Sequence, residues 1–278
     1  MKIINTYLEI VSLTNKMNGD FDMKLYESYL NGISSELSEK VKYDSRHYNF
    51  NGDILPVLKL AMTDNQKLEA AHISFLKAVD GLSQRVEKII GTELHVDIIF
   101  YLGLCNGAGW ATELNDKSVI LLGVEKIIEL GWYGLDDMTA LIYHELGHVW
   151  HKSVVIMYEE ARSERERYIL QLYQEGIAMY FEQLVLSDFN YYHQNKNDWL
   201  HWCISNKHTL NIEYLRRLEA DESAQDFFWD WCNYKGYSDV GYFLGCEFVK
   251  EISNRYSLNE LAKLDIHTIY KEFREYVG

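Results

Sequence analysis

The first third of the chain carries apolar residues at the three- and four-residue spacing of amphipathic helices. The segments "FDMKLYESYLNGI" (21–33) and "QKLEAAHISFLKAVDGLSQRVEKII" (66–90) follow this spacing, with breaks at "NGD" (51–53) and at Gly91. We therefore predict a helical N-terminal part over residues 1–92.

The pattern changes at residue 94, where β-branched and aromatic residues crowd two short segments. "LHVDIIFYLGL" (94–104) and "KSVILLGVEKI" (117–127), separated by the turn-rich "CNGAGWAT", predict two or more strands. Helical spacing returns in "GLDDMTALIYHELGHVWHK" (134–152), where Asp136 and Asp137 suit a helix N-cap, and again in residues 163–186 and most of the remainder. The prediction is a helix-dominated α+β chain with one small sheet, in which residues 93–278 form a second domain or one unit with 1–92.

The composition is that of a globular protein with a strong negative charge. Lys and Arg number 27 against 42 Asp and Glu, so the formal charge of −15 repels phosphate backbones and anionic membrane surfaces. We expect neither nucleic acid nor a membrane as a partner, since no apolar run approaches the roughly 20 residues that cross a bilayer. The first 20 residues lack the apolar segment of a signal peptide, and the four cysteines contain no C-x-x-C. Both features favour a cytoplasmic location.

The segment "LIYHELGHVW" (141–150) contains the spacing H-E-x-x-H within a predicted helix. His144 and His148 are one turn apart on one face, where both imidazoles can reach one cation. Catalytic zinc takes three protein ligands and keeps one position for water, whose proton a nearby carboxylate accepts. The motif therefore predicts a Zn²⁺ site with His144 and His148 as ligands and Glu145 as general base.

A third ligand must come from elsewhere in the chain. His151 shares the helix face but lies roughly 10 Å along the axis from His144, too far to join both other histidines on one ion. Glu175, in "LYQEGIAMYFE", is the better candidate: it follows on the next long helix, and Gly176 beside it permits a close helix crossing. The alternative interpretation is an exposed helical glutamate next to an unrelated glycine.

"HELGH" followed by "EGIA" on a downstream helix resembles the gluzincins, zinc metallopeptidases whose third ligand is a glutamate. "IYHELGHVWH", "YQEGIAMYF" and "GYFLGCEFVKEI" look like a bacterial family of predicted Zn-dependent proteases of unknown function, over roughly residues 95–255. The resemblance implies a zincin-like fold with its small sheet preceding the metal-binding helix. It also implies a peptide or protein substrate, with His144, His148 and Glu175 as ligands and Glu145 as the base.

Two features of gluzincins are missing from the sequence. The Gly-x-Met-Glu-Asn strand of the aminopeptidases is absent, and "GAGWATELN" occupies that region. Met179 stands four residues after Glu175, where thermolysin-like enzymes place a histidine-orienting carboxylate, so that support must come from elsewhere.

The remaining expectations concern the walls of such a site. Tyr242, between Gly241 and Gly245, is the first candidate for a donor to the oxyanion, and His201 and His208 are weaker ones. "VILLGVE" (119–125) would be the edge strand that pairs with substrate, or simply an inner strand. The aromatic segment 226–237 is expected to belong to the core or to a cleft wall.

Four hypotheses follow from these residues. The first is a zinc-dependent peptidase. The second is a non-catalytic zincin-like protein that regulates or binds a partner. The third is a zincin regulator that cleaves a repressor, although no helix-turn-helix is evident, and the fourth is a structural helix with an accidental motif. We favour the peptidase.

Overall fold

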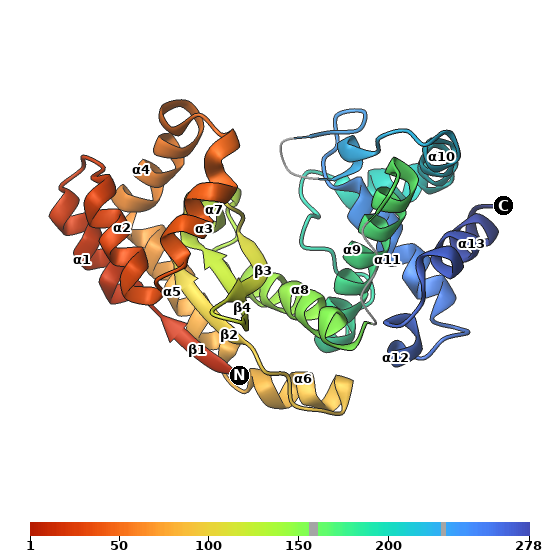
Figure 1. Ribbon diagram of the computed structural model, residues 1–278, viewed down its shortest axis with the longest axis horizontal. Helices are drawn as coiled ribbons and strands as arrows, with labels where there is room; N and C mark the ends of the chain where they lie inside the picture. Colours follow the sequence, from red (N-terminus) through yellow and green to blue (C-terminus); the bar gives the residue numbers. More distant parts are fainter. Residues whose placement is uncertain (156–160, 229–231) are drawn as a thin grey trace. The chain divides into compact units, whose positions relative to one another are not determined.

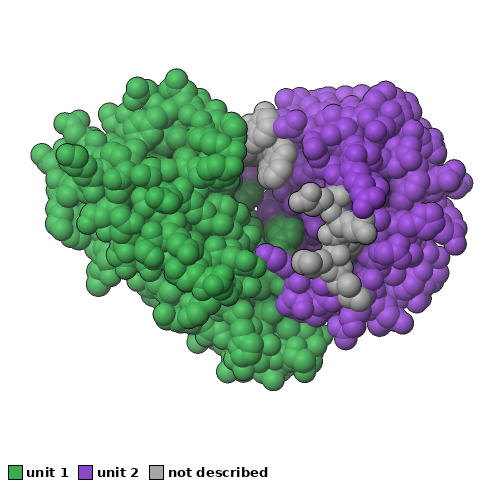
Figure 2. Space-filling view, viewed as in Figure 1, with its two compact units in different colours: residues 1–149 green, residues 150–278 purple. Residues whose placement is uncertain are grey.

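Helices account for most of the structure, a computed structural model that describes residues 1–155, 161–228 and 232–278 (Figure 1). A small sheet lies among them, so the predicted helix-dominated α+β class is confirmed. The described residues divide into two compact units, residues 1–149 and residues 150–278 (Figure 2). The division falls inside one continuous helix, α8 (Leu135–Val154), which contains the H-E-x-x-H motif.

The first unit holds the sheet and the N-terminal helices. Its strands are β1 (Lys2–Asn5), β2 (Asp97–Tyr101), β3 (Gly109–Leu114) and β4 (Lys117–Gly123). Its helices before α8 are α1 (Tyr7–Met17), α2 (Met23–Ile33), α3 (Leu37–Asp44), α4 (Leu55–Thr63), α5 (Asn65–Val79), α6 (Leu82–Ile90) and α7 (Val124–Leu130). The helical segments predicted at 21–33 and 66–90 correspond to α2, α5 and α6.

The strand order in the sheet is β1-β2-β4-β3. β1 and β4 run parallel to β2, and β3 runs antiparallel to β4. β4 is therefore an inner strand, and the expectation that "VILLGVE" forms the edge was wrong. The edge strands are β1 and β3, and the two-residue connection from β3 to β4 places the later strand inside the sheet.

β1 was not predicted, because four residues are too few for a visible two-residue alternation. Ile3 pairs with Ile98 and Ile4 with Ile99, so the start of the chain joins residues that follow it by more than 90 positions. The predicted N-terminal part, residues 1–92, thus contributes a strand to the same sheet as residues 97–123.

Burial in the first unit follows the predicted pattern. Ile98 and Ile120 on one face of the central strands are 0% exposed, and Ile99 and Leu121 on the other face are 3% and 0% exposed, as expected for strands covered on both faces. On α8, Ile142 and Leu146 are also 0% exposed. The motif helix is held in the core by the apolar positions between its polar ones.

The second unit is built from the end of α8 and the remaining helices. These are α9 (Glu164–Leu186), α10 (Trp199–Ala220), α11 (Val240–Ile252), α12 (Leu258–Leu261) and α13 (Ile266–Val277). Phe227 and Phe228 from the aromatic segment are 0% exposed and belong to its core, as predicted, whereas residues 229–231 of that segment lie outside the described ranges. Within the described ranges, no helix has the length and apolar character needed to span a membrane.

Candidate metal centre

The motif helix α8 begins one residue before the predicted caps. It starts at Leu135, so Asp136 and Asp137 lie in its first turn and the expectation that they cap it was wrong. Their carboxylates still lie at the positive end of the helix dipole, where negative charge is favourable. The two aspartates therefore predicted where the helix begins to within one or two residues, but not its first residue.

His144 and His148 come together as their spacing predicts. Their Nε2 atoms are 3.1 Å apart and their rings meet edge to face, with centroids 4.8 Å apart. His144 is buried at 4% exposure, and His148 is half-buried. Two zinc-bound imidazole nitrogens in a tetrahedral site are about 3.3 Å apart, given Zn–N bonds of about 2.0–2.1 Å. The observed pair therefore fits the donor set of one zinc ion.

Glu145 is held by the backbone of the edge strand β3. Its Oε2 accepts a hydrogen bond from the Ala111 amide at 2.8 Å, and the side chain is 7% exposed. A Cβ atom at Gly109 would lie 2.5 Å from Oε1, so only glycine lets the strand approach this closely. The predicted base, Glu145, therefore has a defined position beside β3, an edge strand of the sheet.

Glu175 lies on α9, half-buried, and its neighbour Gly176 makes a close helix crossing, but not the predicted one that would bring the carboxylate to the motif helix. The crossing partner is α11: a Cβ on Gly176 would overlap the Gly245 carbonyl, and a Cβ on Gly245 would be 3.0 Å from the Gly176 Cα. The two glycines thus set the distance between α9 and α11.

Tyr242 stands one turn before Gly245 on α11 and is half-buried. Its ring packs edge-on against Phe228 at 6.0 Å between centroids. Gly241 makes room for the same phenylalanine, because a Cβ there would lie 2.5 Å from Phe228 Cζ. One of the two glycines that drew attention to Tyr242 therefore serves aromatic packing and the other the helix crossing.

A buried pair in the second unit, Glu182 and His193, was not predicted from the sequence. The Glu182 Oε2 and His193 Nδ1 are 3.0 Å apart, and the side chains are 0% and 5% exposed. Gln194 Nε2 lies 2.9 Å from His193 Nε2, so the amide donates to that nitrogen and leaves the Nδ1 proton to face the carboxylate. Glu182 follows Glu175 by seven residues, two helical turns, and this spacing could have identified it.

Potential metal ligands occur in both units of the described chain: His144 and His148 on α8 in the first, and Glu175, Glu182 and His193 in the second. Imidazole nitrogen and carboxylate oxygen are ligands that suit zinc.

His151 was expected to be a partly exposed or core-edge histidine, and His201 and His208 were weaker candidates for the oxyanion donor. His151 is 3% exposed and packs edge-on against Tyr173, which makes it a core residue. His201 is exposed and lies 3.4 Å from Asp198, and His208 is exposed on the same helix α10.

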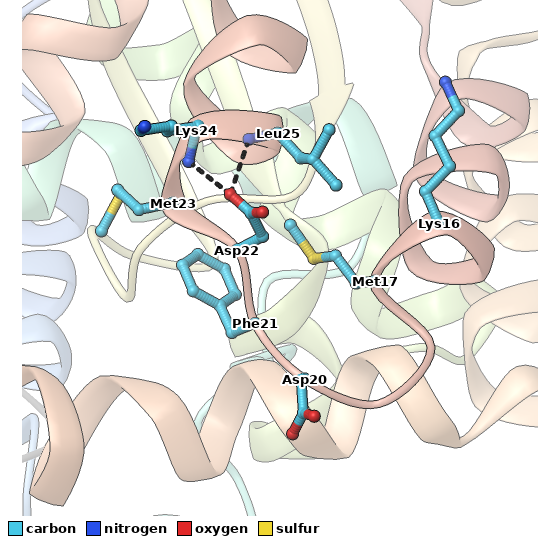
Figure 3. Close-up of a pocket in the computed structure, with 8 residues that line it drawn as sticks. All are labelled: Lys16, Met17, Asp20, Phe21, Asp22, Met23, Lys24 and Leu25. Atoms are coloured by element: carbon cyan, nitrogen blue, oxygen red, sulfur yellow. Dashed lines mark hydrogen bonds between the residues drawn. The ribbon is translucent and has the colours of Figure 1, made fainter.

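A pocket of about 590 Å³ lies in the first unit, at the turn between α1 and α2 (Figure 3). Residues 16, 17 and 20–25 line it. Asp22 is the N-cap of α2: its Oδ1 accepts hydrogen bonds from the backbone amides of Lys24 at 2.8 Å and Leu25 at 3.1 Å. None of the predicted site residues lines this pocket.

Comparison of the chain with protein-family models, with curated proteins and with solved structures finds no match.

Proposed function

We propose that the protein is a zinc-dependent peptidase of the gluzincin type. The observation that carries the proposal is the grouping on α8 and β3: two imidazole nitrogens 3.1 Å apart, with the Glu145 carboxylate held beside an edge strand by the Ala111 amide. A structural helix gains little from burying His144 and Glu145 beside the half-buried His148, since burial of polar groups is costly without compensation.

Glu175 is the proposed third ligand. Within the second unit, the end of α8 packs against α9: Trp150 stacks on Phe181 with centroids 5.5 Å apart, and His151 meets Tyr173 at 6.1 Å. Glu175 lies between Tyr173 and Phe181 on α9, and His148 precedes Trp150 by two residues on the same continuous helix. Glu182 is the competing carboxylate on α9 and is tested below.

Zinc bound to this donor set would polarise the scissile carbonyl and lower the pKa of a water molecule. The chain's own contribution is position and proton transfer. Glu145, held at Oε2, would accept the proton of the attacking water and pass it to the leaving amine. β3 would hold an extended peptide by main-chain hydrogen bonds along its outer edge, and Tyr242 would donate to the oxyanion.

The decisive experiment combines metal analysis with digestion of a peptide library. Wild type should hold about one zinc per chain and cleave peptides, and Glu145→Gln should keep the zinc while losing cleavage by at least ~10²-fold. The glutamine can still accept the Ala111 amide, so the variant tests proton transfer and leaves the fold in place. Cleavage at the wild-type rate by this variant would eliminate the proposal, and bound zinc without any hydrolysis would favour a non-catalytic zincin-like protein.

Two matched variants on α9 identify the third ligand. Glu175→Gln should lower zinc content strongly, whereas Glu182→Gln should retain it under the same dialysis. The reverse result would transfer the ligand role to Glu182.

A further inference from the structure

A second buried carboxylate, Glu125, lies outside the proposed metal ligands. It stands in the first turn of α7 and is 0% exposed. Its Oε2 accepts the Gly103 amide at 2.7 Å, and its Oε1 accepts the Cys105 amide at 3.0 Å. Both donors belong to the loop 102–108 that joins β2 to the edge strand β3.

The loop is shaped around this carboxylate. A Cβ at Gly103 would lie 2.5 Å from Glu125 Oε1, and one at Gly123 would lie 3.1 Å from the same oxygen. Cys105 adopts a φ of 61°, a left-handed conformation that a cysteine holds only when its surroundings determine it. The loop conformation and the position of the carboxylate therefore depend on each other.

The end of the loop determines where β3 begins. Gly123 donates its amide to the Ala108 carbonyl at 3.0 Å, and its Cα lies against the carbonyl of Gly107, since a Cβ would be 2.6 Å from that oxygen. Gly109 follows directly and touches Glu145, and Ala111 donates to the Glu145 carboxylate. A continuous series of close contacts thus runs from Glu125 to Glu145 inside the first unit.

We propose that Glu125 is a positioning residue for Glu145: it anchors the loop 102–108, and the loop holds β3 where the Ala111 amide meets the Glu145 carboxylate. The catalytic meaning of this placement rests on the proposed peptidase function, whereas the placement itself does not. In a peptidase, loss of the anchor would affect the rate of the chemical step more than the binding of substrate.

The surroundings of Glu125 give the anchor a recognisable pH response. Burial raises the pKa of Glu125 from 4.5 to about 7. The hydrogen bonds from backbone amides and the charge of Lys126 lower this pKa but do not outweigh burial. The other titratable groups that face it are Tyr26 and Tyr29 of α2, Tyr101 of β2 and Cys105 of the loop. Opening the loop to water would return the carboxyl to its ordinary pKa, so opening releases a proton and becomes easier as pH rises toward 7.

Hydrogen exchange followed over pH tests the anchor on the full chain. After correction for intrinsic exchange, opening of the peptide covering 102–111 in the wild type should increase on the order of 100-fold from pH 5 to pH 8. Glu125→Gln should remove this pH dependence. At pH 5 it should also exchange about tenfold faster than wild type, because one backbone amide then faces the glutamine NH₂. The Ala111 amide resonance should shift in the variant, a change that a general loss of stability would not produce.

Controls separate the outcomes. Glu129→Gln, on the same helix α7 at an exposed ion pair with Lys126, should behave as wild type. Gly103→Ala places a methyl group against the Glu125 carboxylate and so disturbs the same contact from the loop. It should also make the peptide 102–111 exchange faster and shift the Ala111 amide resonance. Unchanged exchange and an unmoved Ala111 resonance in Glu125→Gln would overturn the positioning role. If these changes appear while the wild type cleaves no peptide, the peptidase proposal fails and the positioning role stands.

Discussion

At the scale of single residues, Glu145 is placed by backbone atoms. The Ala111 amide holds one oxygen, and the absence of a side chain at Gly109 leaves room for the other. A carboxylate fixed in this way loses little freedom when it accepts a proton, which favours general base catalysis. The position of Glu145 thus depends on a glycine 36 residues before it, which the motif itself does not reveal.

Gly109→Ala should therefore impair activity without removing the metal. The new Cβ would lie 2.5 Å from Glu145 Oε1 and 2.7 Å from its Cγ, so the carboxylate must move. A displacement of about 1 Å costs on the order of 10² in rate, and the crowding costs about 1–3 kcal/mol of unfolding free energy. Peptide cleavage, zinc content and thermal unfolding measure the three effects.

Gly32→Ala is the matched control for this substitution. Gly32 lies inside α2 with no atom within 4 Å of an added Cβ, so alanine should stabilise the helix by up to ~1 kcal/mol and leave activity unchanged. Wild-type cleavage by Gly109→Ala would show that Glu145 tolerates displacement.

At the scale of elements, the α9–α11 crossing organises the second unit. Gly176 and Gly245 bring the two helix backbones into direct contact, and the large apolar residues Phe243, Phe248 and Ile177 are buried around them. Backbone atoms cannot move aside as the end of a side chain can, so a methyl group at either glycine must push the helices apart.

Gly176→Ala is expected to destabilise the protein by about 3 kcal/mol, the upper end of the usual cost of overpacking. Its Cβ would lie 2.5 Å from the Gly245 carbonyl carbon. Denaturant unfolding monitored by circular dichroism measures the loss, again with Gly32→Ala as the comparison. If Gly176→Ala were as stable as wild type, the two helices could separate at the crossing without loss of stability, and the proposed role of the two glycines would be wrong.

At the scale of the whole molecule, Glu125 links stability to pH. Its folded pKa of about 7 lies above the ordinary 4.5, so the folded chain retains a proton that the unfolded chain releases between these values. The contribution of Glu125 to stability therefore falls as pH rises from about 4.5 to about 7 and changes no further above it. Carboxylates with lowered pKa, such as Glu213 at about 2, act in the opposite direction at lower pH.

The free energy of unfolding isolates this effect when wild type is compared with Glu125→Gln. From pH 4.5 to pH 7.5, the difference between variant and wild type should increase in favour of the variant by on the order of 3 kcal/mol. Denaturant titrations at several pH values measure the difference. A difference that does not change with pH would show that Glu125 ionises in the folded chain at its ordinary pKa.

The sequence alone was sufficient wherever the interactions are local. Helical spacing predicted α2, α5, α8 and α9, and the four-residue spacing of His144 and His148 predicted that their imidazoles meet, because one helix turn determines both. The absence of a long apolar run likewise agrees with the described helices, none of which is long and apolar enough to cross a membrane.

Only the tertiary structure decided the features that join distant segments. The pairing of β1 with β2, the edge position of β3, the Gly109–Glu145 contact and the burial of Glu125 and Glu182 all depend on residues brought together from far apart. No short-range sequence pattern determines which of two strands lies at the edge of the sheet, or which glutamates are buried. Burial and strand pairing are properties of the assembled core, and they turn the H-E-x-x-H spacing into a placed group of side chains.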